Sequence, residues 1–236
     1  MSVGQAAMIL AAGFGTRMRP LTDTRPKPLI EVAGKPIIDH DYDALRAANV
    51  TCIVVNAHYL AGQIETWAAQ KTDPPVIVSD ERAEILDTGG GIVHALPLLG
   101  GEPFFVLNSD SFWRDRGRPA LERLRTAWNA DAMDCLLLLS RRDAAVGYDG
   151  QGDFIREQTG RLRRRPADEH SALAYMGVYL VHPRLFAQAP QGPFSMNLLW
   201  NRAIAGGRLH GIIHDGLWLH VGTPDAIGLA EAALRA

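Results

Sequence analysis

One stretch near the N-terminus combines glycines with closely spaced cations. Gly13 and Gly15 directly follow an apolar run at 6–11, and the segment continues to Pro28. Its cationic side chains are Arg17, Arg19, Arg25 and Lys27. Glycines after a strand allow backbone N–H groups to face an anion at close range, and clustered cations suit a polyphosphate. The stretch 10–28 therefore predicts a triphosphate-binding loop.

An ordinary strand-to-loop turn with solvated cations is the competing interpretation. Met18 stands where the dinucleotide-binding fingerprint has its third glycine, and the chain has no Walker A run. Pro26 and Pro28 flank Lys27 and restrict the backbone on both sides of it. The ordered combination of strand, glycines, arginines and Pro-Lys-Pro favours the anion site over the turn.

A second polar group follows an apolar run at 104–107, where Asn108, Ser109 and Asp110 come in succession. Ligands of open α/β sheets bind at the carboxyl ends of the strands. A carboxylate at such an edge suits Mg²⁺, which prefers oxygen ligands. Asp110 is thus a candidate metal ligand, with helix capping as the alternative.

The composition is that of a globular protein without a membrane span. Of 236 residues, 47% are hydrophobic, but no run reaches the roughly 18 apolar residues that a transmembrane helix needs. The formal net charge of −2 argues against non-specific nucleic-acid binding. Cys52 and Cys135 lie in apolar runs without zinc spacing, which predicts buried reduced thiols. With no secretory signal pattern at the N-terminus, we expect a cytoplasmic protein.

Short apolar runs alternate with helical patterns through the first 140 residues. We expect strands at 6–11, 52–55, 76–78, 104–107 and 136–139, with helices at 37–48, 59–69, 91–98 and 119–129. This rhythm predicts an α/β protein of three layers, α/β/α, with a mostly parallel central sheet.

The rhythm changes after residue 140. We expect a hairpin formed by 154–157 and 161–164, strands at 173–181, 209–213 and 217–221, and helices at 196–205 and after Thr223. We interpret 1–236 as a single domain, with a binding core at 1–140. The part at 141–236 is then a small β/α elaboration that carries the pocket for a second substrate.

The stretch L-A-A-G-F-G-T-R-M-R-P-L-T followed by P-K-P resembles the signature of sugar-1-phosphate nucleotidyltransferases. The resemblance extends to 87–91, 108–110, 152–154, 176–179 and 221–223. It implies a Rossmann-like, GT-A-like fold. In its compact length and in the motifs T-G-G-G at 88–91 and G-D-F at 152–154, the chain most resembles the N-acetylmuramate-1-phosphate uridylyltransferases of the family. The mannose-1-phosphate guanylyltransferases are near neighbours.

The resemblance implies that a sugar-1-phosphate oxygen attacks the α-phosphorus of a nucleoside triphosphate and that pyrophosphate leaves. Arg17 would stabilise the pyrophosphate, Lys27 would reach the α-phosphate, and Asp110 would bind Mg²⁺. The implied nucleotide contacts are Ala11, Ala12, Gly13, Gly15, Thr16, Gly89, Gly90 and Asn108, where Gly89 and Gly90 let the backbone approach the base. The implied sugar-phosphate contacts are Gly152, Asp153 and Gly177.

The chain departs from the family pattern at the second metal ligand, because His220 stands where an aspartate is usual. Imidazole is a poorer Mg²⁺ ligand than carboxylate. Asp110, substrate phosphates and water can hold the metal alone, which we favour. Otherwise His220 binds Mn²⁺ or Co²⁺ or contacts phosphate, or Asp225 compensates.

The family's Glu-Lys-Pro motif, whose lysine meets the sugar phosphate, is also missing. Arg161, Arg163, Arg164 and Arg165 lie in the corresponding region. Solvated arginines on a hairpin are the favoured interpretation of these four, so the residue that contacts the sugar phosphate stays open.

UTP and N-acetylmuramate-1-phosphate are the favoured substrates, with GTP and mannose- or glucose-1-phosphate as alternatives. A catalytically weak regulatory protein that binds nucleotide sugars is the alternative from another class. The presence of Arg17, Lys27 and Asp110 together favours the enzyme. Neither nucleic acid nor membrane is expected as a partner. A monomer is favoured over a homodimer because the chain ends one helix after Thr223.

Overall fold

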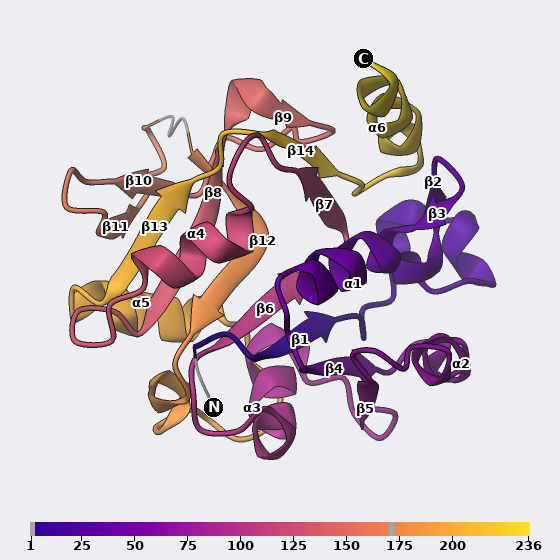
Figure 1. The fold of residues 1–236 in the computed structure, drawn as a ribbon, viewed down its shortest axis with the longest axis horizontal. Coiled ribbons are helices and arrows are strands. Elements are labelled where there is room, and N and C mark those ends of the chain that lie inside the picture. The colour runs from indigo at the N-terminus through magenta and orange to yellow at the C-terminus, as the bar shows by residue number, and fades with distance from the viewer. Residues whose placement is uncertain (1–2, 170–172) are drawn as a thin grey trace.

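A mixed sheet forms the middle layer of the computed structural model, which describes residues 3–169 and 173–236 (Figure 1). Its strands are β1 Ala6–Leu10, β4 Cys52–Ala57, β5 Val76–Asp80, β6 Phe104–Asn108, β8 Cys135–Arg141, β10 Phe154–Arg156, β11 Leu162–Arg164, β12 Leu173–Val181 and β13 Leu209–Ile213. They follow the order β11-β10-β12-β6-β1-β4-β5, and β8 joins β12 to β13. Strands β6, β1, β4 and β5 are parallel, whereas β12 runs antiparallel to β6, β8 and β10.

Helices cover both faces of this sheet, which confirms the predicted three-layer α/β/α fold. The helices are α1 Ile37–Ala47, α2 Ala61–Ala69, α3 Asp87–Leu99, α4 Ala120–Ala127, α5 Asn197–Ala205 and α6 Pro224–Arg235. The core on one face includes side chains of α1, α2 and α4, and the core on the other includes those of α3 and α5. Strand β1 supplies both, Ala7 and Ile9 to the first and Ala6 and Met8 to the second. A strand buried on both faces is apolar at every position, as its sequence shows.

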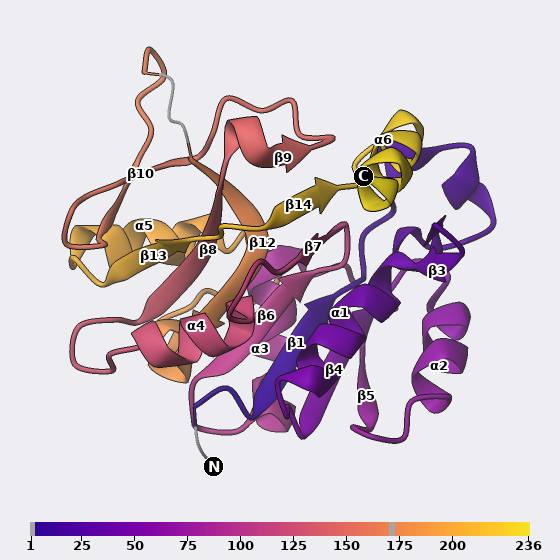
Figure 2. The same cartoon turned by 45° about the horizontal axis from the view of Figure 1, so that its top comes forward.

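A second, smaller sheet lies beside the main one (Figure 2) and was not predicted as such. It contains β7 Ser111–Arg114, β14 Leu217–His220 and β9 Ala145–Val146. Strand β7 begins directly after Asp110 and runs antiparallel to β14, with Ser111 opposite His220. A two-stranded ribbon of β2 Glu31–Val32 and β3 Lys35–Pro36 precedes α1. The small sheet brings the end of β14 to the carboxyl end of β6.

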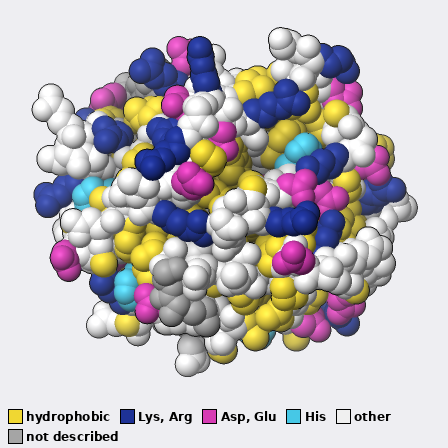
Figure 3. Space-filling view, viewed as in Figure 1, with side chains coloured by type: hydrophobic (Ala, Val, Ile, Leu, Met, Phe, Trp, Pro, Cys, Tyr) yellow, Lys and Arg dark blue, Asp and Glu magenta, His cyan; other side chains and the backbone are white. Residues whose placement is uncertain are grey.

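The molecular surface and the cysteines agree with a globular chain. Basic and acidic side chains are interspersed over the face in Figure 3. None of the helices in the described ranges has the length and apolar character needed to cross a membrane. Both cysteines are free. Cys135 is buried as predicted, whereas Cys52 is only half-buried.

Helix α3 begins at Asp87, four residues before the predicted start at 91, so three successive glycines lie in its first turns. The N–H groups of Gly89 and Gly90 donate to the carbonyl oxygen of Phe194 at 2.8 and 3.2 Å. A Cβ on Gly89 would lie 2.2 Å from the Phe194 ring, and one on Gly90 would lie 2.5 Å from the Gly192 carbonyl oxygen. These glycines let the segment 192–194 pack directly on the helix.

We therefore predict that Gly89→Ala lowers the free energy of unfolding by about 1–3 kcal/mol, as overpacking does. Adding Phe194→Ala should relieve the clash, so that the double variant is less destabilised than the two single effects summed. Gly90→Ala is the matched control, because its Cβ would meet backbone that Phe194→Ala leaves in place. Urea unfolding of the variants measures this coupling, and strict additivity in the Gly89 pair would contradict the packing role.

The ring of His40 on α1 stacks on Phe112 of β7, with centroids 3.9 Å apart and planes 9° from parallel. Burial, and secondarily the charge of Lys35, lowers the pKa of His40 to about 4. The unfolded chain then binds a proton near pH 6.5, before the folded chain does. The stability that the neutral ring contributes is present above about pH 6.5 and is lost as the pH falls towards 4.

We expect His40→Gln to reduce the fall in Tm between pH 7.5 and pH 5 relative to the unmodified protein. Thermal melts across this range measure it, with the exposed His94→Gln on α3 as the control. An equal fall in Tm for the unmodified and His40 variant proteins would show that His40 does not contribute to acid destabilisation.

Candidate active site

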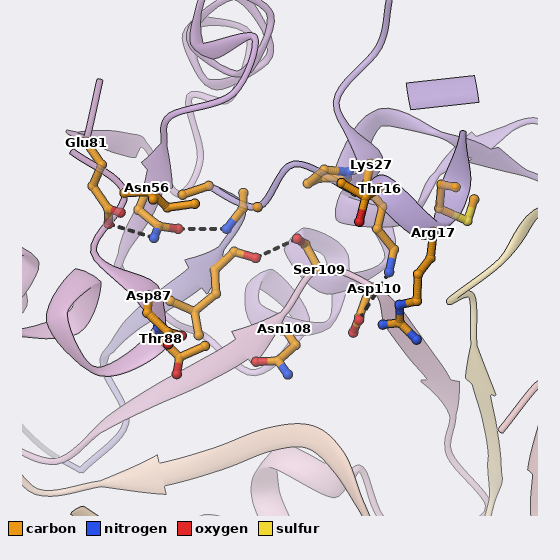
Figure 4. A pocket seen from close by; sticks show the side chains of 18 of the residues that line it. Thr16, Arg17, Lys27, Asn56, Glu81, Asp87, Thr88, Asn108, Ser109 and Asp110 are labelled. Carbon is orange, nitrogen blue, oxygen red and sulfur yellow. Dashed lines mark hydrogen bonds and ion pairs between the residues drawn. The ribbon is translucent and has the colours of Figure 1, made fainter. Parts of the chain in front are cut away.

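A cleft of about 530 Å³ opens at the carboxyl ends of β1 and β6 (Figure 4). Its lining includes nine predicted residues: Ala11, Ala12, Gly13, Gly15, Thr16, Arg17, Lys27, Asn108 and Asp110. The glycine-rich loop and the Asn108–Asp110 turn, which are about ninety residues apart in the chain, thus form one cavity. This is the edge at which parallel strands present their ligand-binding loops.

An ion pair between Lys27 and Asp110 connects the loop to the sheet. Lys27 Nζ lies 3.2 Å from Asp110 Oδ2, and the two side chains are 12% and 29% exposed. Gly15 adopts a left-handed conformation at φ +62°, and a Cβ there would lie 3.0 Å from Lys27 Cβ. The Thr22 hydroxyl donates to the Gly15 carbonyl oxygen at 2.9 Å. The loop folds back on Gly15 and thereby directs Lys27 to the carboxylate.

Arg17 lines the cleft from a short 3-10 turn, Thr16–Met18, and the last residue of this turn, Met18, is fully buried. No described carboxylate lies within ion-pair distance of Arg17, so its charge faces the cavity without a partner there. Arg19 and Arg25 instead pair with acidic residues outside the cleft lining, Asp23 at 3.3 Å and Glu31 at 3.5 Å. Only two of the four predicted loop cations line the cleft.

His220 contacts the same carboxylate from the end of β14. Its Nδ1 lies 3.2 Å from the Gly147 carbonyl oxygen, and its Nε2 lies 3.8 Å from Asp110 Oδ2. Since a carbonyl oxygen only accepts, Nδ1 carries the hydrogen in the neutral ring and the Nε2 lone pair is free to bind a metal. The Val221 N–H donates to the Asp110 carbonyl oxygen at 2.9 Å, which fixes this approach.

These donors fit a divalent ion whose remaining coordination positions are filled by the substrate. Asp110 supplies a carboxylate and His220 an imidazole nitrogen, and no group of three potential side-chain ligands occurs in the described ranges. Mg²⁺ commonly takes one or two protein carboxylates and fills its other positions with phosphate oxygens and water. Asp225 is exposed in the first turn of α6 and does not line the cleft.

The opposite end of the cleft holds a polar chain that sequence analysis missed. Asn56 Oδ1 accepts from the Ala11 N–H at 2.7 Å, and Asn56 Nδ2 donates to Glu81 Oε1 at 2.8 Å. Glu81 is 2% exposed, and its other oxygen accepts from the Leu86 N–H. The N–H of Ala11 is therefore already engaged, and any ligand contact of Ala11 would use its other atoms. Asn56 directly follows the apolar run predicted as a strand at 52–55, just as Asn108 follows the run at 104–107, and this signal could have identified it.

Gly89 and Gly90 differ from the expected arrangement, because neither lines the cleft. Their N–H groups bond to Phe194, and their missing side chains leave room for 192–194. Asp87 and Thr88, which directly precede them, line the cleft in their place. The two glycines accordingly have a packing role, and their approach to a base stays a prediction.

A buried acid on α1 also lies within electrostatic range of the ion pair. Asp41 is fully buried, and neither of its carboxyl oxygens has a hydrogen-bond partner in the described part of the chain. Burial, followed by the charge of Asp110, raises the pKa of Asp41 well above its usual range. No sequence motif marked this buried acid.

A second pocket of about 230 Å³ adjoins the cleft, and the two share Leu10, Asp87, Thr88 and Asn108. Asp153 lines it, and Asp153 Oδ2 accepts from the Tyr175 N–H at 2.8 Å. Gly152 and Gly177 do not line it. Gly177 lies at φ +83° in the irregular part of β12, where a Cβ would be 3.0 Å from Asn108 Cβ. Gly177 thus supports Asn108 from behind.

The chain resembles known proteins in both sequence and fold. A family model described as nucleotidyl transferase matches residues 6–236. The chain is 46% identical to the N-acetylmuramate alpha-1-phosphate uridylyltransferase of Caulobacter vibrioides, covering 97% of this chain and 96% of that protein. It is 36% identical to the Neisseria meningitidis protein of the same name, covering 96% of each.

The fold is shared with the solved structure of a putative glucose-1-phosphate thymidylyltransferase from Bacillus anthracis. The TM-score is 0.81 at 20% identity, over 98% of this chain and 95% of the other. Loop, carboxylate and second pocket therefore lie in a framework that these proteins share. By the family match and the two full-length relatives, the chain belongs to the nucleotidyl transferase family and is a sugar-1-phosphate nucleotidyltransferase.

Proposed function

We propose that the protein transfers a uridylyl group from UTP to N-acetylmuramate-1-phosphate and releases pyrophosphate. The observation that carries the proposal is the polarity of the cleft, which places Arg17, Lys27 and Asp110 at one end and Asn56 and Glu81 at the other (Figure 4). The cationic end suits the triphosphate, and the hydrogen-bonding end suits the nucleoside. Likeness to two uridylyltransferases over nearly the whole chain supports the choice of substrates.

The proposed chemistry is a direct displacement at the α-phosphorus. An oxygen of the sugar phosphate, bound near Asn108 and Asp153, forms the new P–O bond while the bond to pyrophosphate breaks. Lys27 stabilises the charge on the α-phosphate, and Arg17 stabilises the departing pyrophosphate. Such reactions depend on positioning and charge neutralisation more than on a protein nucleophile. The Ser109 hydroxyl, which donates to the Leu10 carbonyl oxygen at 2.6 Å, is held away from that role.

Asp110, completed by substrate phosphates and water, would hold a divalent ion, and His220 is the alternative second protein ligand. Mg²⁺ is favoured for this position, with Mn²⁺ or Co²⁺ as alternatives. When bound, the ion would neutralise phosphate charge beside Lys27. A division into a nucleotide-binding core at 1–140 and a sugar-phosphate part at 141–236 is part of the proposal, since β10, β12 and α5 line the second pocket. A monomeric state and a cytoplasmic location stay predictions.

Pyrophosphate release from a matrix of triphosphates and sugar-1-phosphates tests the proposal. UTP with N-acetylmuramate-1-phosphate should give the highest kcat/KM. A higher kcat/KM for GTP with mannose-1-phosphate would show that these two, and not UTP and N-acetylmuramate-1-phosphate, are the substrates. Nucleotide binding without pyrophosphate release for any pair would favour the regulatory alternative.

We expect Lys27→Gln to lower kcat by about 10²–10³-fold, because it removes a charge aimed at the reacting phosphate. Arg17→Gln should have a similar effect through the leaving group. Arg19→Gln is the matched control, because that side chain is exposed and paired with Asp23, and its kcat should stay within about twofold. Equal losses in all three variants would show a general effect of loop charge.

His220→Asp should retain or raise Mg²⁺-dependent turnover and lower the activity with Co²⁺ relative to Mg²⁺, because a carboxylate is the harder ligand. Steady-state rates with each metal measure this, and Asp110→Asn should lose turnover with all of them. A collapse of His220→Asp activity with every metal, at an unchanged Tm, would show that the imidazole is required for another contact.

A further inference from the structure

The second pocket contains one cation, Arg164 of β11, whose setting differs from that of a solvated hairpin arginine. Its guanidinium carbon lies 4.7 Å from the centre of the Phe154 ring and 5.9 Å from that of Trp200. The side chain is half-buried, and burial lowers its pKa. Arg163, the preceding residue, is by contrast exposed and pairs with Glu169 at 3.5 Å.

Neutral amides hold the Arg164 guanidinium in place. Its Nε donates to Asn201 Oδ1 at 2.8 Å, and one terminal nitrogen donates to Asn197 Oδ1 at 2.7 Å. The other terminal nitrogen, Nη1, has no hydrogen-bond partner, and no carboxylate lies within ion-pair distance of the guanidinium, among the residues that the structure describes. The orientation is thus fixed by aromatic and amide contacts, while the charge and donors remain available for an anion.

Two acidic side chains line the same pocket, but both have other contacts. Asp153 accepts from the Tyr175 N–H and, at 3.4 Å, from the Tyr148 hydroxyl. Asp87 accepts from the Thr88 N–H and lies on the boundary with the cleft. Arg164, by contrast, lines the second pocket but not the cleft. The pocket can therefore accept sugar hydroxyls at its carboxylates and an anionic group at Arg164.

The sheet separates Arg164 from the reacting phosphates. Strand β11 is the third strand from β6, through β10 and β12. At about 4.8 Å between neighbouring strands, its backbone lies about 14 Å from that of β6, whose end carries Asp110. The sugar 1-phosphate must approach Asp110 and Lys27 to react. An anion at Arg164 consequently belongs to another part of the acceptor molecule.

We propose that Arg164 binds a carboxylate carried by the sugar ring of the acceptor and so selects acidic sugar-1-phosphates over neutral ones. The inference rests on the proposed function. The Nη1 of Arg164 can donate to a carboxylate oxygen, which gives a directional charge-assisted contact. N-acetylmuramate-1-phosphate carries such a group on its lactyl ether, and N-acetylglucosamine-1-phosphate is the same sugar without it.

The test compares kcat/KM for these two acceptors with UTP, measured by pyrophosphate release. Arg164→Gln should lower the ratio of the two values, acidic over neutral, at least tenfold, mainly through KM for the acidic acceptor. Arg164→Lys should keep part of the ratio. Arg163→Gln, the neighbouring exposed arginine, is the matched control and should leave the ratio unchanged. Thermal melts of each variant check folding.

An unchanged ratio in Arg164→Gln would overturn the inference. If both acceptors lose kcat/KM equally at an unchanged Tm, the guanidinium contacts the shared 1-phosphate instead. If the unmodified protein releases no pyrophosphate with either acceptor, the proposed function fails rather than the carboxylate site. Calorimetric binding of the same two sugar phosphates then decides the inference, because only a carboxylate site predicts tighter binding of the acidic one that Arg164→Gln abolishes.

Discussion

The contact between Lys27 and Asp110 is the constraint on which the active site depends. A polyphosphate and a carboxylate repel each other, so a cleft that binds both needs a compensating positive charge at their meeting point. Lys27 supplies it, because its Nζ lies 3.2 Å from Asp110 Oδ2 with little exposure to solvent. Screening by water is weak for such a partly buried pair, which makes its position decisive. The same oxygen faces His220, so all three groups converge on one point.

The surrounding structure holds that point from two sides. On the loop side, Met18 is buried and Gly15 permits the close turn that delivers Lys27. On the sheet side, the Asp110 carbonyl oxygen accepts from Val221, which joins β14 to the end of β6. Gly177 supports Asn108, the residue common to the cleft and the second pocket. A rigid frame of this kind is what a reaction governed by positioning requires.

Much of this arrangement follows from local sequence signals. The alternation of apolar strands with helical patterns predicted the layers, and the glycines and cations of 10–28 predicted the loop. Asn56 and Glu81 were missed because their roles arise from contacts to Ala11 and to each other across the fold. The start of α3 was placed too late because successive glycines disfavour a helix locally, while packing against Phe194 requires them. In both cases the outcome was decided by contacts between segments that are distant in the sequence.

The hairpin arginines show the same limit. Composition favours solvent for all four, and Arg163 does lie in solvent. Arg164 is half-buried because β10 and α5 place Phe154 and Trp200 beside it, which no spacing within the hairpin could predict. The side chains that surround Arg164 thus come from segments that meet only in the folded chain.

In the proposed mechanism this site works by charge and position, with no covalent link between nucleotide and protein. The most direct measurement is the stereochemistry at the α-phosphorus, followed by ³¹P NMR with one diastereomer of the α-thio analogue of UTP. A single in-line displacement predicts inversion of configuration in the nucleotide-sugar product. Retention would require two displacements through a nucleotidylated residue and would contradict the account.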